Sequence, residues 1–110
     1  MVRPVPAVRF DDVLAEATRN GERRIRLLKL DCEGSEYPIL LTSKMLHLVD
    51  EICGEYHVLS DALHAEFEHE LTPEALDACL RDAGFEVEWL PSDWAGGETN
   101  AMGLFFARRR

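Results

Sequence analysis

The sequence predicts a small α/β domain in which a parallel sheet ends in one antiparallel hairpin. Apolar segments typical of strands alternate with segments typical of helices, an order that produces parallel strands joined by right-handed crossovers. The last two strand segments, 85–89 and 101–107, are separated only by a loop, so they should pair as a hairpin. The first of them alternates apolar and acidic residues, whereas the second is apolar throughout and typical of a central strand. A chain of 110 residues can bury one hydrophobic core, so residues 1–110 should form a single domain.

The first part of the chain contains an extended lead-in, a helix and a strand. The two prolines within residues 1–10 disfavour a helix there. A helix is expected over 11–20, because apolar residues including Val13 and Leu14 recur at helical spacing and an Asn-Gly pair ends the segment. The nearly continuous apolar run at 25–31 is typical of a strand covered on both faces, as in parallel sheets.

The middle of the chain should add two short helical pieces and a second strand. Residues 36–41 follow the first strand as one or two helical turns, and Ser43 can cap a further short piece. A strand is expected at 52–57, although Gly54 weakens it because glycine has no side chain to pack.

The helix over 73–83 has the clearest boundaries in the sequence. Thr72 is a good N-cap, and Gly84 suits the position just past the end. The spacing of its apolar residues predicts one buried stripe, with Asp77 on the side that faces water.

Charge and cysteine content exclude several classes of protein. With 12 Lys+Arg against 21 Asp+Glu, the net charge of −9 argues against a general nucleic-acid binder or a binder of anionic membranes. No apolar run reaches the roughly 20 residues of a membrane span, and the first residues do not resemble a secretory signal. Cys32, Cys53 and Cys79 form no CxxC pair, which suggests reduced thiols in a cytoplasmic protein and no structural zinc site.

Acidic residues and a histidine lie where the first two strands end, which is the ligand-binding edge of open α/β sheets. Asp31 ends the first strand, and Glu33 and Glu36 follow it. Glu55 and His57 end the second strand, where residues two apart point to the same side. If the strands are neighbours, a carboxylate could orient His57 as a general base, or several carboxylates could hold a divalent cation.

The same residues also have a purely structural interpretation, which stays open at this point. Asp31 and Glu33 would then cap the following helix, and His57 would merely end a strand, because acidic residues at strand ends are common in α/β domains.

Three other features were considered as metal, phosphate or ligand sites, and most of them suit a structural role better. The acidic, histidine-containing segment 61–70 lacks zinc-type spacing and is typical of a solvated surface. The three arginines at 108–110 suit a frayed, solvated tail better than a phosphate contact. Trp89 is expected in the core, whereas Trp94 lies in a polar loop and is the better candidate for a ligand contact.

The stretch 28–36, Leu-Lys-Leu-Asp-Cys-Glu-Gly-Ser-Glu, resembles the FkbM-type methyltransferase family. That family carries a Lys-hydrophobic-Asp-hydrophobic-Glu-Gly-small-Glu motif at its fourth strand. Residues 9–14 and 55–57 resemble the family's neighbouring segments, and the chain from Gly84 onward resembles its closing hairpin. The resemblance extends from about residue 8 to residue 107.

The resemblance implies a truncated class I methyltransferase (Rossmann-like) sheet, with strands 4-5-7-6 present. It also implies transfer of a methyl group from S-adenosyl-L-methionine to a hydroxyl oxygen of a small molecule. The expected catalytic residues are Asp31, Glu55 and His57. The residues expected to border the cofactor are Asp31 and Cys32. Those expected to bind substrate are Glu33, Glu36 and Trp94.

The sequence departs from the family's pattern because it contains no Gly-x-Gly-x-Gly turn and no earlier strand with an acidic residue for the cofactor's ribose. The domain is therefore expected to be weak or inactive alone. Strand 25–30 would be a sheet edge with unpaired backbone groups, which tends to recruit a second copy, an N-terminal partner chain or residues 1–10. The alternative is a non-catalytic remnant that acts as an interaction module through this edge. A metal-dependent hydrolase that uses Asp31, Glu33 and His57 has no motif in its favour.

Overall fold

The computed structural model describes residues 8–31, 35–57, 72–91 and 102–110, which build one four-stranded mixed sheet. The strands are β1 (Ile25–Leu30), β2 (Val49–His57), β3 (Phe85–Pro91) and β4 (Met102–Arg109). Their order across the sheet is β1-β2-β4-β3. β1 and β2 are parallel, while β4 is antiparallel to both β2 and β3. The predicted parallel pair, closing hairpin and central last strand are all confirmed.

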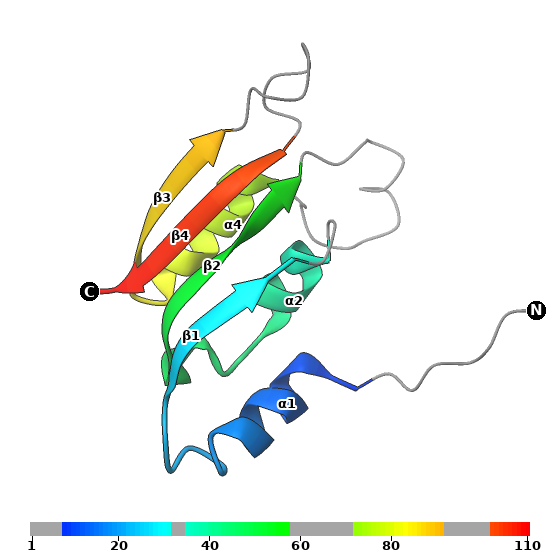
Figure 1. The fold of residues 1–110 in the computed structure, drawn as a ribbon, viewed down its shortest axis with the longest axis vertical. Coiled ribbons are helices and arrows are strands. Elements are labelled where there is room, and N and C mark those ends of the chain that lie inside the picture. The colour runs from blue at the N-terminus through cyan, green and yellow to red at the C-terminus, as the bar shows by residue number, and fades with distance from the viewer. Residues whose placement is uncertain (1–7, 32–34, 58–71, 92–101) are drawn as a thin grey trace, which may run out of the picture.

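Helices cover one face of this sheet. They are α1 (Phe10–Ala17), α2 (Glu36–Thr42), the 3₁₀ turn η1 (Leu46–Leu48) and α4 (Pro73–Asp82). In Figure 1, α2 and α4 lie behind the sheet, and α4 packs against both α2 and β3. The buried core lies between these helices and the sheet and includes Tyr37, Leu76 and Phe105, each 0% exposed.

The ends of α1 and α4 follow the local rules that the sequence predicted. The side chain of Thr72 accepts a hydrogen bond of 3.1 Å from the backbone N–H of Ala75, and Gly84 has a φ of 98° just past the end of α4. α1 ends at Ala17, before the predicted residue 20, and a left-handed turn follows with φ of 57° at Asn20 and 93° at Gly21. Local backbone chemistry is sufficient to set these boundaries.

The opposite face of the sheet carries no described element, which corrects the expectation that the first strand is covered on both faces. Leu27 of β1 is 56% exposed, and Leu90, Leu104 and Phe106 are 43–45% exposed. A single helical layer can bury only one face of a sheet, because successive side chains of a strand point to opposite sides. Of the apolar residues of α1 named above, Leu14 is buried and Val13 is 47% exposed.

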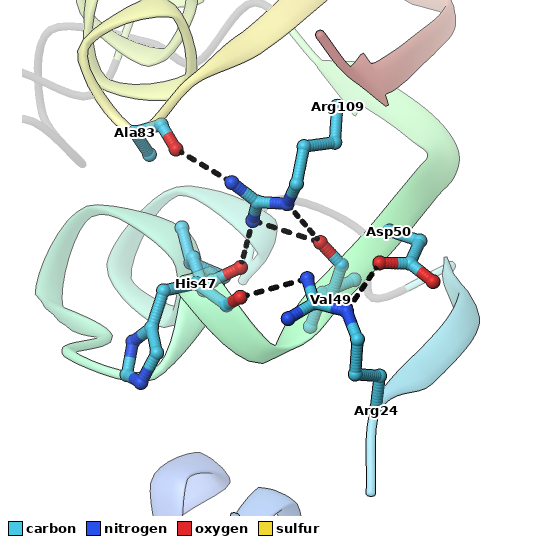
Figure 2. Close-up of polar contacts among 7 residues, drawn as sticks. Arg24, His47, Val49, Asp50, Ala83 and Arg109 are labelled. Atoms are coloured by element: carbon cyan, nitrogen blue, oxygen red, sulfur yellow. Dashed lines mark hydrogen bonds and ion pairs between the residues drawn. The ribbon is translucent and has the colours of Figure 1, made fainter.

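The C-terminal arginines are not a solvated tail, because Arg108 and Arg109 are part of β4 and Arg109 is half-buried. Figure 2 shows the guanidinium of Arg109 among three backbone carbonyls. It donates to the oxygens of Val49 (3.0 and 2.8 Å), Ala83 (3.1 Å) and Leu46. It also stacks 4.4 Å from the ring centroid of Phe85. This side chain therefore joins η1, the start of β2 and the residue that follows α4.

A second arginine strengthens the same corner of the fold. Arg24 precedes β1 and forms a 2.7 Å ion pair with Asp50, and it donates 2.9 Å to the carbonyl of His47 (Figure 2). The start of β1 is thereby fixed to the start of β2. Parallel neighbours need such a link, because no tight turn joins them.

Asp77 does not simply face water as its position on the helix suggested. It accepts a 2.7 Å hydrogen bond from Nε1 of Trp89 and pairs with Arg81 at 2.8 Å. Burial alone would raise the pKa of Asp77, but the hydrogen bonds from Arg81 and Trp89 outweigh it and lower the pKa. Trp89 is half-buried as expected, with its ring edge-on to Tyr56 at 5.0 Å.

Candidate functional site

The carboxyl ends of β1 and β2 lie side by side at one edge of the sheet (Figure 1). The register pairs Leu30 with Gly54, so Asp31 follows β1 directly beside the last residues of β2. A Cβ atom at Gly54 would lie only 2.6 Å from the carbonyl oxygen of Leu30 and 3.1 Å from the ring of Phe105. Glycine is therefore needed at this position for space, and it lets the two strand ends approach each other.

His57 meets Glu36 at this edge. Nδ1 of His57 lies 3.1 Å from Oε1 of Glu36, which is the first residue of α2. The side chain of Glu36 is 0% exposed, whereas that of His57 is 23% exposed. A carboxylate at one ring nitrogen fixes the orientation of an imidazole and favours the tautomer with its proton on that nitrogen. Among the described residues, Nε2 of His57 has no hydrogen-bond partner, so this nitrogen can accept a proton.

Tyr37, the residue after Glu36, holds the backbone of the same histidine. Its hydroxyl donates to the carbonyl oxygen of His57, and its side chain is completely buried. Burial and the neighbouring charge of Glu36 raise the pKa of Tyr37, so this phenol stays protonated and remains a donor. Two consecutive residues of α2 therefore fix both the ring and the backbone of His57. The sequence signal for Tyr37 was its position in the first helical turn after a strand, and sequence reasoning missed it.

Asp31 and Glu55 line a groove on the uncovered face of the sheet, at the same strand ends. The groove has a volume of about 350 Å³. Its wall combines the charged side chains of Lys29, Asp31 and Glu55 with apolar surface, and the apolar part comes from Leu30, Cys53, Gly54, Leu104 and Phe106. Such a groove can take an amphipathic ligand that carries hydroxyl or amino groups at one end.

The structure thus brings most of the expected catalytic residues to one edge but divides them between two contacts. His57 pairs with Glu36, and Asp31 shares the groove with Glu55. The expected contacts of Cys32, Glu33 and Trp94, and the acidic segment 61–70, lie outside the described residues. Within the described parts of the chain, no group of three or more His, Cys, Asp or Glu side chains could hold a metal ion.

Two features of the chain bear on S-adenosyl-L-methionine, the cofactor that the family resemblance implies. The groove beside Asp31 offers two carboxylates as acceptors for hydroxyl or amino groups, with apolar surface for a base. The sequence has no glycine-rich turn that would let backbone N–H groups approach the rest of such a cofactor.

Comparison with known proteins gave one match. The family model described as the Methyltransferase FkbM domain matches residues 2–87. This range includes β1, α2, β2 and α4 and extends into β3, whereas β4 lies beyond it. Searches of curated proteins and of solved structures found no match. Among the described residues, no helix is long and apolar enough to cross a membrane.

Proposed function

Because this chain belongs to the FkbM methyltransferase domain family, we propose that it forms the acceptor-side part of an S-adenosyl-L-methionine-dependent O-methyltransferase. The observation that supports this best is the buried Glu36–His57 pair, which lies at the carboxyl ends of two parallel strands. Ligands of open α/β sheets bind at that edge. The proposed substrate is a small molecule with a free hydroxyl group.

The order β1-β2-β4-β3 supports an equivalence with strands 4-5-7-6 of the class I methyltransferase sheet. In that equivalence β4 is the antiparallel strand inserted between its neighbours, as the register of its two pairings allows. The missing strands would extend the sheet beyond β1.

We assign the removal of the acceptor's hydroxyl proton to Nε2 of His57. Glu36 acts as a positioning residue, because its buried carboxylate contacts the ring at Nδ1 and stabilises the imidazolium that forms. Asp31 and Glu55 bind the polar groups of cofactor or substrate in the neighbouring groove. The cofactor, when bound, supplies the methyl group.

We further propose that the chain has little or no activity until a second polypeptide segment pairs with β1. Within the described residues, β1 has a strand neighbour on one side only. Its other edge presents backbone donors and acceptors that an N-terminal partner chain or a second copy can use. The alternative is a non-catalytic module that only associates through this edge. Such a module would have no affinity for the methyl donor.

The free thiols of Cys53 and Cys79 are consistent with a cytoplasmic location.

Titration of the isotope-labelled chain with S-adenosyl-L-methionine, followed by NMR, tests the cofactor assignment. We expect weak binding, with a dissociation constant on the order of 1 mM, because only part of the site is present. The amide signals that shift should include those of Leu30, Asp31 and Gly54, and Asp31→Asn should reduce the shifts severalfold. Asp12→Asn, on an exposed part of α1, should leave them unchanged. Absence of shifts at several millimolar cofactor would favour the non-catalytic module.

The role of Glu36 can be tested without any substrate. In nitrogen–proton correlation spectra of the neutral imidazole, His57 should carry its proton on Nδ1. Glu36→Leu should shift the proton toward Nε2, because Nδ1 loses the carboxylate. His47, which is exposed, serves as the internal control and should not change. Equal tautomer populations in both proteins would remove Glu36 from its proposed role.

A further inference from the structure

The uncovered face of the sheet, called the open face below, has an ordered pattern of side chains. Its residues are those that point away from the helices on all four strands. Four large apolar side chains on it are 43–56% exposed, namely Leu27, Leu90, Leu104 and Phe106. Scattered single exposed apolar residues are ordinary, but one from β1, one from β3 and two from β4 on a single face form a patch of the kind that binds protein.

One row across the open face runs from a positive charge to a negative charge. The register aligns Lys29 with Cys53, Cys53 with Phe106, and Phe106 with Glu88. Lys29 and Glu88 therefore lie on the two outer strands, with the thiol and the aromatic ring between them. Both charged side chains are exposed, and within the described residues neither forms an ion pair.

The neighbouring row has opposite charges at its two central positions. It runs from Leu27 through Glu51 and Arg108 to Glu86. Nε of Arg108 lies 3.2 Å from Oε1 of Glu51, and the two side chains are 78% and 47% exposed. Each of these charges can accept a second partner from above the sheet, because most of the pair is still in contact with water.

We propose that the open face binds the open face of a second copy of this chain. In this dimer the two-fold axis lies in the space between the two facing sheets. It runs parallel to the strands and passes over the line midway between β2 and β4. It places β1 of one copy over β3 of the other, and β2 over β4. Lys29 then faces Glu88 of the second copy, and the same pair forms again on the other side, as the symmetry of an isologous dimer requires. Glu51 faces Arg108 in the same way, whereas Glu86 faces Leu27, so the charged pairs across the interface are Lys29–Glu88 and Glu51–Arg108.

The centre of the dimer is apolar in this arrangement. Cys53 of each copy lies opposite Phe106 of the other, and both residues line a shallow groove of about 310 Å³ on the open face. Two aligned sheets pack about 10 Å apart with their strands within about 30° of each other. A Lys and a Glu side chain together span that separation, so the ion pairs form at the rim and the aromatic rings in the middle.

The size of the open face sets the strength of the contact. Four strands about 4.8 Å apart, with about six residues each in contact, give a projected area of roughly 400 Å². Both faces together bury roughly 800 Å², which is below the usual range for stable interfaces, so we expect a weak contact with a dissociation constant of about 10 to 100 µM. The contact leaves the outer edge of β1 available for the strand addition proposed above. It covers Lys29, Cys53, Leu104 and Phe106, which also line the groove beside Asp31 and Glu55, so dimerisation and ligand binding in that groove exclude each other.

Charge reversal with rescue tests the proposal. Sedimentation velocity of the whole chain over about 5 to 500 µM should show a reversible monomer–dimer equilibrium. Lys29→Glu and Glu88→Lys should each weaken dimerisation about tenfold, because each replaces two attractive pairs by two repulsive ones. The double variant, with the original net charge, should recover the original dissociation constant. Lys44→Glu and Glu22→Lys, exposed and outside the open face, are the matched controls and should have no effect.

A second variant tests the centre of the interface independently. Phe106→Asp should leave a monomer at every concentration, with circular dichroism showing that the fold is retained. A wild-type chain that is monomeric up to about 500 µM would refute the proposal. So would a dimer that both single charge reversals leave intact, or a double variant that fails to recover.

Discussion

Arg109→Ala should lower the free energy of unfolding by about 3 kcal/mol, because hydrogen bonds from charged groups are stronger than neutral ones and several are lost together. Arg109 donates to the carbonyls of Leu46, Val49 and Ala83 and stacks on Phe85. Those carbonyls lie in η1, at the start of β2 and just after α4, so one guanidinium links three separate segments of the chain. Water can reach part of this cluster, which keeps the loss below the sum of the individual bonds.

Arg109→Lys should lose most of the same free energy, because one ammonium group cannot reach three carbonyls with the geometry of a planar guanidinium. Burial and the charge of Arg24 lower the pKa of Arg109, but the group keeps its proton at any ordinary pH. Arg108→Ala is the matched control: its side chain is 78% exposed, so the change should cost about 0.5 kcal/mol or less. Urea denaturation of the three variants measures these differences, and equal losses for Arg108 and Arg109 would contradict the assignment.

Gly54→Ala should destabilise the domain by about 2 to 3 kcal/mol, although it adds only one methyl group. The new Cβ would lie 2.6 Å from the carbonyl oxygen of Leu30. A backbone atom cannot rotate away, so β1 and β2 must separate at their carboxyl ends. We therefore expect the amide signals of Asp31 and Glu55 to shift, together with a widened groove beside them.

Cys53→Ala provides the control for this change, because Cys53 is the preceding residue of the same strand and faces the open side. It should cost about 1 kcal/mol or less and leave the amide signals of Asp31 in place. A Gly54→Ala variant as stable as the Cys53→Ala variant would show that the strand ends are not held as closely as the structure places them.

Much of the fold was predictable because it depends on local chemistry. The cap at Thr72 and the stop at Gly84 act within one helical turn, and both are found where the sequence predicts them. The hairpin of β3 and β4 follows from the lack of a helical segment between them. The Glu36–His57 contact was also among the predicted encounters, because parallel strands bring their carboxyl ends to one edge.

Other features were not predictable because they depend on segments far apart in the sequence. Arg109 contacts a carbonyl 63 residues away, so no periodicity around it could distinguish it from a solvated tail. Asp77 occupies the water-facing side of its helix by spacing, yet Trp89 reaches it with the indole N–H. The number of sheet faces that helices cover also depends on where the helices pack, and the apolar run at 25–31 could not show this.

By itself the sequence determined the order of helices and strands, the ends of the helix at 73–83, the direction of the closing hairpin and, through residues 28–36, the family. These follow from hydrophobic periodicity, capping and a contiguous motif, which act over a few residues. The start of β2 and the end of α1 each differ from the predicted position by three residues. Only the tertiary structure decided that Glu36 is buried against His57, that Arg109 joins η1, β2 and the residue after α4, and that no described element covers the second face of the sheet. Such features depend on which residues far apart in the sequence come into contact. Those contacts form only when the helices and strands pack together.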